Sequence, residues 1–124
     1  MKRNLYEELG IWKSSERRKP LILRGARQTG KTHLLKEFGE KEYDGVAYFN
    51  FEEDPRLKDF FTGRLEPFAL IEALGLYRKE AIRPGRDLII FDEIQACNEA
   101  LNSLKYFQEQ ANEFHIASAG SLLG

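Results

Sequence analysis

The sequence has little of what several large classes of protein require. Its 124 residues include one cysteine, Cys97, which excludes an internal disulfide and a cysteine-based metal site. Neither histidine, His33 or His115, has neighbouring metal ligands in the sequence. The longest apolar runs, such as "LIIF" at 88–91, are far too short to span a membrane, and the opening "MKRNLYEELG" lacks the apolar core of a signal peptide. We therefore expect a cytoplasmic protein without a membrane segment.

Neither sign of charge is in excess. The chain has 19 lysines and arginines against 20 aspartates and glutamates, for a formal net charge of −1. No overall field draws it toward nucleic acid or acidic membranes, so nucleic-acid binding by this segment is not indicated. With 42% hydrophobic residues, the length is that of one compact domain over 1–124.

The pattern of apolar residues predicts strands that alternate with helices. Runs typical of strands occupy 21–25, 45–51, 87–93 and 114–121, and helical spacing is found in 4–12, 33–39, 55–61, 66–82 and 98–111. This order predicts an α/β fold, in which a parallel sheet is covered by helices on both faces. The continuous run "LIIF" is typical of a strand that is buried on both faces.

Local signals predict where several helices begin and end. Asp54 and Glu66 each directly precede a proline, which is the arrangement of a helix N-cap followed by proline in the first helical position. For Asp54, this capping role is favoured over metal binding. Asn98 is expected to cap the last helix, and the helix that starts near residue 33 is expected to end near Gly39. The basic segment 13–20 reads as an exposed connector, and Trp12 is expected in the core rather than stacked on a nucleotide base.

The segment "GARQTGKT" matches the pattern G-x-x-x-x-G-K-[ST] between a predicted strand and a predicted helix. Its glycines allow backbone N–H groups to turn inward around a phosphate. Lys31 is expected to reach the β- and γ-phosphates, and the Thr32 hydroxyl is offered to Mg²⁺. The helix that follows directs the positive end of its dipole at the anion. The predicted phosphate-binding residues are Gly25, Ala26, Arg27, Gln28, Thr29, Gly30, Lys31 and Thr32.

A second group of candidate residues follows the strand at 88–91. Asp92 and Glu93 emerge at its carboxyl end, the edge of an open α/β sheet at which ligands bind, and the glycine loop follows a strand at the same edge. We interpret Asp92 as the acid that holds Mg²⁺, usually through water, and Glu93 as the catalytic base that polarises the attacking water.

Other polar residues are weaker candidates. In "SAGS" at the end of the fourth strand, Ser121 is favoured slightly, over an ordinary turn, to hydrogen-bond the attacking water or the γ-phosphate. Gln95 either contacts the same water or is a surface amide. Glu52 and Glu53 follow the second strand, and their role stays open.

The segments "LILRGARQTGKT", "IIFDEIQ" and "AGSLLG" resemble, in order and spacing, those of the AAA-type P-loop ATPases of bacteria and archaea, in the group whose ATPase domain precedes a poorly characterised C-terminal domain. The resemblance covers nearly the whole chain. It implies Gly25 to Thr32 as the Walker A loop, Asp92 as the Walker B acid linked to Mg²⁺, Glu93 as the catalytic acid and a sensor-like position near Ser121.

The same resemblance implies a three-layer P-loop NTPase with strand order 1-4-3-2. Members of the family continue with a fifth strand, a candidate arginine finger and the C-terminal domain, and this sequence stops at Gly124. We therefore expect an N-terminal fragment of a longer protein that is slow or inactive alone. With no fifth strand, residues 21–23 are expected at an open sheet edge, which favours self-association.

The function predicted from the sequence is that of a Mg²⁺-dependent ATPase domain that hydrolyses ATP at the β–γ bond to drive or gate an unidentified process. ATP and Mg²⁺ are the expected ligands, and adenine is preferred to guanine mainly through the resemblance. Two alternatives stay open: a small-molecule P-loop kinase, and a switch module that binds nucleotide without hydrolysis. A glutamate directly after the strand aspartate suits water activation better than transfer to an acceptor.

Overall fold

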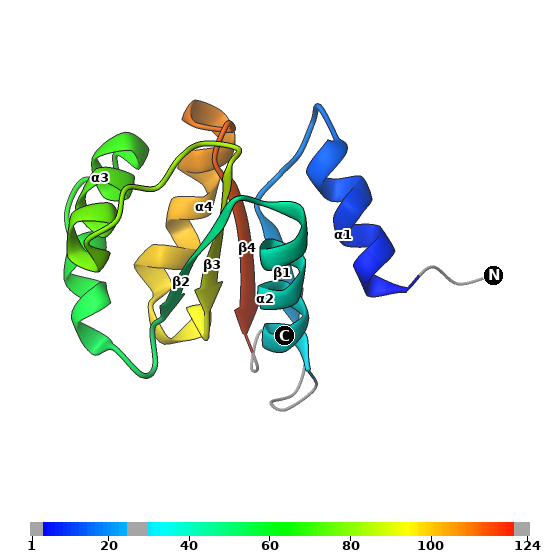
Figure 1. Ribbon diagram of the computed structural model, residues 1–124. Coiled ribbons are helices and arrows are strands. Elements are labelled where there is room, and N and C mark those ends of the chain that lie inside the picture. Colours follow the sequence, from blue (N-terminus) through cyan, green and yellow to red (C-terminus); the bar gives the residue numbers. More distant parts are fainter. Residues whose placement is uncertain (1–3, 25–29, 121–124) are drawn as a thin grey trace.

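The computed structural model describes residues 4–24 and 30–120. It contains four strands, four α-helices and two short 3₁₀ helices in this part of the chain (Figure 1). In chain order they are α1 (Leu5–Ser14), β1 (Leu21–Arg24), α2 (Lys31–Glu42), β2 (Gly45–Asn50), η1 (Pro55–Phe61), α3 (Pro67–Arg78), β3 (Asp87–Asp92), η2 (Ile94–Ala96), α4 (Asn98–Gln110) and β4 (His115–Gly120).

The four strands form one parallel sheet in the order β1-β4-β3-β2. This confirms the expected α/β class and strand order. Strands β1 and β2 lie at the two edges, and β3 and β4 are central. Because all four strands run in the same direction, their carboxyl ends lie along one edge of the sheet. The start of α2 and the end of β3 lie together at this edge, although Thr32 and Asp92 are 60 residues apart in the sequence.

Helices cover both faces of the sheet and give three layers (Figure 1). On one face, α1 and α2 contribute Leu9, Leu35 and Phe38, which pack with Leu88 and Ile90 of β3. On the other face, η1, α3 and α4 pack over alternate residues of the same strands. Successive side chains of a strand point to opposite faces of the sheet, so alternate residues of each strand belong to the two hydrophobic clusters.

Aromatic rings fill the second cluster. Phe91 of β3 lies 5.5 Å from Phe51 and 5.9 Å from Phe61, in edge-to-face geometry. All three rings are fully buried. Every residue of β3 is buried, as expected from its continuous apolar run.

The ends of two helices were predicted wrongly. Helix α3 ends at Arg78, before the predicted end at 82, because Lys79 takes up a left-handed C-cap conformation. Helix α2 continues past Gly39 to Glu42, and Gly39 lies buried inside it. A Cβ at this position would meet Cγ2 of Val46 at 2.5 Å and Cδ2 of Leu88 at 3.1 Å. Glycine is present because the helix backbone approaches the sheet closely, rather than because the helix ends.

Two predicted caps also differ from the structure. Asp54 precedes the 3₁₀ helix η1 but makes no capping hydrogen bond, and its carboxylate accepts instead from the Tyr77 hydroxyl at 2.6 Å. Asn98 is the first residue of α4, and Cys97 occupies the N-cap position without a side-chain cap. By contrast, Glu66 caps α3 as predicted. Its carboxylate accepts the backbone N–H groups of Phe68 and Ala69 in the first turn of that helix.

The basic connector is less exposed than expected. Arg18 is half-buried and donates to the backbone carbonyls of Lys13, Ser15 and Asn112, so it ties the connector to the end of α4. Trp12 packs against the first cluster, as predicted, and its indole N–H donates to the Lys19 carbonyl at 2.6 Å.

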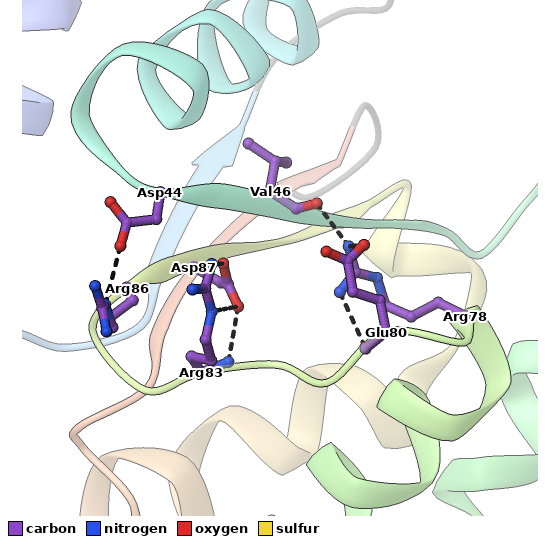
Figure 2. A network of polar contacts seen from close by, with 7 residues as sticks. All are labelled: Asp44, Val46, Arg78, Glu80, Arg83, Arg86 and Asp87. Atoms are coloured by element: carbon purple, nitrogen blue, oxygen red, sulfur yellow. Dashed lines mark hydrogen bonds and ion pairs between the residues drawn. The ribbon is translucent and has the colours of Figure 1, made fainter.

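A polar network holds the amino ends of β2 and β3, at the end of the sheet away from Asn50 and Asp92 (Figure 2). Arg83 donates to both carboxylate oxygens of Asp87, at 3.2 and 2.9 Å, and Arg86 pairs with Asp44 at 2.9 Å. Arg78 of α3 donates to the Val46 carbonyl of the edge strand β2 at 3.0 Å. Charged side chains of this kind shield an edge strand from pairing with another chain.

Candidate functional site

The predicted site residues divide into those that the structure describes and those outside the described residues. Lys31 and Thr32 begin α2, Asp92 ends β3 and Glu93 follows it, all at the carboxyl edge of the sheet (Figure 1). The other predicted residues lie outside the described ranges: Gly25, Ala26, Arg27, Gln28, Thr29 and Ser121.

Gly30 is the residue from which α2 starts. Its φ is 82°, in the left-handed region, and its carbonyl accepts the N–H of Leu34 at 2.9 Å as the first bond of the helix. Among the described residues, a Cβ at this position would meet nothing within 4 Å. The glycine is therefore required by the backbone conformation. The N–H groups of the first turn have no intrahelical partners, which is the usual basis of anion binding at a helix N-terminus.

Thr32 and Asp92 contact each other directly. The Thr32 hydroxyl donates to Oδ2 of Asp92 at 3.0 Å, across 60 residues of sequence. The contact joins the first turn of α2 to the carboxyl end of β3. It brings together the residue predicted to offer a hydroxyl to Mg²⁺ and the acid predicted to hold it.

Asp92 receives two further hydrogen bonds. The N–H of Glu93 donates to Oδ1 at 2.9 Å, and the hydroxyl of Tyr48 donates to Oδ2 at 2.5 Å. Asp92 is only 6% exposed, so these donors compensate a buried carboxylate. Sequence reasoning missed Tyr48. The alternation of "GVAYFNF" places Tyr48 on the sheet face that α2 covers, but its partner depends on the register of β2 against β3.

Glu93 adopts a backbone conformation that is rare for a residue with a side chain. Its φ of 51° and ψ of 46° are left-handed, and such residues cost on the order of 1–3 kcal/mol and cluster at functional sites. Oε1 of Glu93 accepts the amide N–H of Gln95 at 2.8 Å. Gln95 is thus a partner of Glu93, rather than the surface amide of the alternative interpretation.

The two acids left open in the sequence lie beside the same edge. The side-chain oxygen of Asn50 accepts the N–H groups of both Glu52 and Glu53 at 2.9 Å, which fixes the turn after β2. The side-chain nitrogen of Asn50 donates to Oε1 of Glu53 at 2.9 Å and to the Tyr48 hydroxyl at 3.2 Å.

The donor set fits a magnesium ion that is carried with a phosphate. Thr32 donates its one proton to Asp92, which leaves the hydroxyl lone pairs for a cation. No group of three or more His, Cys, Asp or Glu that could hold a metal occurs in the described part of the chain. Mg²⁺ in phosphate sites commonly takes one or two protein ligands and completes its shell with phosphate oxygens and water.

The remaining candidates from the sequence are not part of this site. His33 lies exposed on α2, whereas His115 is buried on β4. Cys97 is buried, and burial raises the pKa of its thiol, which makes it a poor nucleophile. Ser118 is fully buried on the sheet face opposite to Asp92, and its hydroxyl has no hydrogen-bond partner among the described residues.

A parallel sheet in this order, with a glycine-initiated helix next to a buried strand-ending aspartate, fits the AAA-type P-loop ATPase class. Comparison with known proteins gives the same class. The family model described as "AAA domain" matches residues 17–124, and the chain belongs to this family. Membership supports a nucleotide-binding, ATPase-like function for this domain. None of the curated proteins matches the chain.

Two solved structures share the fold. One is described as Thermotoga maritima RuvB T158V, with a TM-score of 0.55 and 15% identity. The other is PCH-2 of C. elegans, with a TM-score of 0.53 and 16% identity. The match covers 95% of this chain in both cases but only 37% of each of those chains. In the described residues, no helix combines the length and apolar character needed to cross a membrane.

Proposed function

We propose that this chain is a Mg²⁺-dependent ATPase domain that binds ATP at the carboxyl edge of its sheet and hydrolyses the β–γ bond. The observation that carries the proposal is the contact of 3.0 Å between the Thr32 hydroxyl and Asp92. A nucleotide at the start of α2 would place its terminal phosphates beside this pair.

Each residue has a distinct role in this proposal. The loop from Gly25 to Thr32 encloses the phosphates, and Lys31 neutralises charge on the β- and γ-phosphates. Thr32 and Asp92 would hold the cation. When bound, the cation would neutralise phosphate charge and orient the transferred group. Ser121 is proposed to hydrogen-bond the γ-phosphate or the attacking water.

Glu93 accepts a proton from the attacking water. Its carboxylate follows Asp92 directly, and the hydrogen bond from Gln95 to one oxygen restricts its rotation. Hydrolysis then yields ADP and inorganic phosphate, and the proton passes from water to the Glu93 carboxylate. We propose that this turnover drives or gates a further process.

Binding and turnover of ATP by three forms of the protein test the proposal. Single-turnover reactions, with protein in excess over labelled ATP, detect slow hydrolysis that steady-state assays miss. The unaltered protein should release inorganic phosphate. Lys31→Ala should lose nucleotide binding, whereas Glu93→Gln should bind ATP with unchanged affinity and release no phosphate.

Product analysis separates the alternatives. A phosphorylated small molecule in place of free phosphate would indicate a kinase, and bound but unchanged ATP would indicate a switch module. Unchanged phosphate release by Glu93→Gln would contradict the role given to that residue.

A further inference from the structure

Tyr48 makes a contact with the site that no feature of the sequence motifs requires. It lies on β2, next to the strand that carries Asp92, and its hydroxyl donates to Oδ2 at 2.5 Å. This oxygen also accepts the Thr32 hydroxyl. A length of 2.5 Å is typical of a charge-assisted hydrogen bond between a hydroxyl and a carboxylate.

The direction of this hydrogen bond is set by the neighbours of Tyr48. Asn50 donates to the Tyr48 oxygen at 3.2 Å, so the proton of the hydroxyl is left to point at Asp92. The amide orientation of Asn50 is itself fixed, because its oxygen accepts the N–H groups of Glu52 and Glu53. Burial and the hydrogen bond to Asp92 raise the pKa of Tyr48, so the hydroxyl stays protonated at neutral pH.

The ring of Tyr48 is also held in place. The ammonium group of Lys36, one turn after Thr32 on α2, lies 3.9 Å from the centre of the ring. The ring of Tyr48 is therefore held by Lys36 of α2, and its hydroxyl is held by Asn50 of the same strand. This is the arrangement of an outer partner that orients a metal-binding carboxylate.

We propose that Tyr48 is a positioning residue, which holds Oδ2 of Asp92 against Thr32 and so keeps the carboxylate turned toward a magnesium ion carried by the nucleotide. This inference rests on the proposed function. Without the Tyr48 hydroxyl, Oδ2 loses one of its two donors and the carboxylate gains freedom to rotate about its χ2 bond. The affinity for Mg²⁺ in the nucleotide complex then falls.

The test uses the magnesium enhancement factor, which we define as the dissociation constant of a slowly hydrolysed ATP analogue in EDTA divided by that in saturating Mg²⁺. Loss of an outer partner commonly lowers metal affinity by about 10- to 100-fold. Tyr48→Phe should therefore lower the magnesium enhancement factor at least about tenfold; if the factor of the unaltered protein is itself below about ten, it should fall to one. The dissociation constant in EDTA should change by less than about twofold. The readout is equilibrium binding and needs no turnover.

Tyr77→Phe is the matched control. It removes a hydroxyl that also donates to a carboxylate, that of Asp54 at 2.6 Å, outside the site. Its enhancement factor should equal that of the unaltered protein. Tyr48→Phe removes one oxygen and leaves Asp92 with two other donors, so the fold should persist, which thermal unfolding checks.

The outcomes separate this inference from the proposed function. An enhancement factor above one in the unaltered protein that is the same in Tyr48→Phe would overturn the role of Tyr48 alone. A factor of one in the unaltered protein, or no binding of the analogue, would overturn both. Weaker binding of Tyr48→Phe by the same ratio in EDTA and in Mg²⁺ would assign Tyr48 to nucleotide contact or folding and also contradict the inference.

Discussion

Lowering the pH should destabilise the protein through one buried histidine, His115. It begins β4 and is only 8% exposed, and its Nδ1 shares a hydrogen bond of 2.6 Å with the Tyr43 hydroxyl. Burial, together with the nearby positive charges of Arg18 and Lys13, lowers the pKa of His115 to about 4. In the unfolded chain, the pKa returns to about 6.5.

The direction of the pH effect on stability follows from the folded and unfolded pKa values of His115. The unfolded state binds a proton at a higher pH than the folded state does, so the contribution of His115 to stability is complete above pH 6.5. It is lost as the pH falls from about 6.5 toward about 4. Linkage with these pKa values gives a loss of about 2 kcal/mol in the free energy of unfolding between pH 8 and pH 5.

Urea unfolding at a series of pH values measures this loss. Trp12, the one tryptophan in the sequence, packs edge-on against His115 at 5.9 Å and reports by fluorescence, and circular dichroism checks that unfolding is two-state. His115→Gln keeps a group that can accept from or donate to the Tyr43 hydroxyl, but it does not titrate. Between pH 8 and pH 5, the free energy of unfolding of His115→Gln should therefore fall by about 2 kcal/mol less than that of the unaltered protein. Parallel pH profiles for the two proteins would refute the account of a neutral buried histidine.

Three further predictions concern the fold, and urea unfolding measures each. Gly39→Ala should destabilise the protein by about 1–2 kcal/mol, because overlap of the new methyl group with the stiff Val46 side chain outweighs the better helix propensity of alanine. Unchanged stability would mean that the helix can move away from the sheet. Burial raises the pKa of Asp87, but the hydrogen bonds from Arg83 outweigh it and lower the pKa overall, so stability should fall as the pH drops below about 4. Asp87→Asn should lack this dependence, and an equal acid response in both forms would contradict the assignment. Glu66→Ala should cost about 1 kcal/mol and Glu66→Asp less, since only the first removes the cap of α3; equal losses would show that the cap contributes little.

Hydrophobic periodicity was sufficient to predict the sheet and its layers. The run at 88–91 is apolar throughout because β3 is covered on both faces, and no other common element explains so short a run between charges. The strand order followed from the resemblance to a family. Periodicity alone gives elements and faces, and it does not say which strands are neighbours.

The errors arose where tertiary packing decides the local structure. Gly39 is a helix terminator by local rules, yet α2 continues through it because only glycine fits against Val46. Asp54 has the sequence of a cap, but the Tyr77 hydroxyl takes its carboxylate. In both cases, the decisive contact is made by a residue of a different element of the fold.

The candidate site was predictable to the extent that its chemistry is local. The glycine pattern and the two acids at the end of the third strand were enough to name Thr32, Asp92 and Glu93 as candidates, and the structure places the first two in contact. The contact of Tyr48 with Asp92 was not predictable, because it depends on which strands are neighbours and on their register. The left-handed conformation of Glu93 was equally hidden, since no residue type at 93 signals it.

The central claim is that Thr32 and Asp92 act together on one magnesium ion carried by a nucleotide. A double-mutant cycle of the magnesium enhancement factor tests this most directly, with Thr32→Val, Asp92→Asn and the combination of both. If the two residues share one ion, either single substitution removes most of the magnesium enhancement factor. The factor of the double variant is then no lower than that of the single variant with the lower factor. If the two losses instead multiply, or neither substitution changes the factor, the residues do not share a cation and the account is wrong.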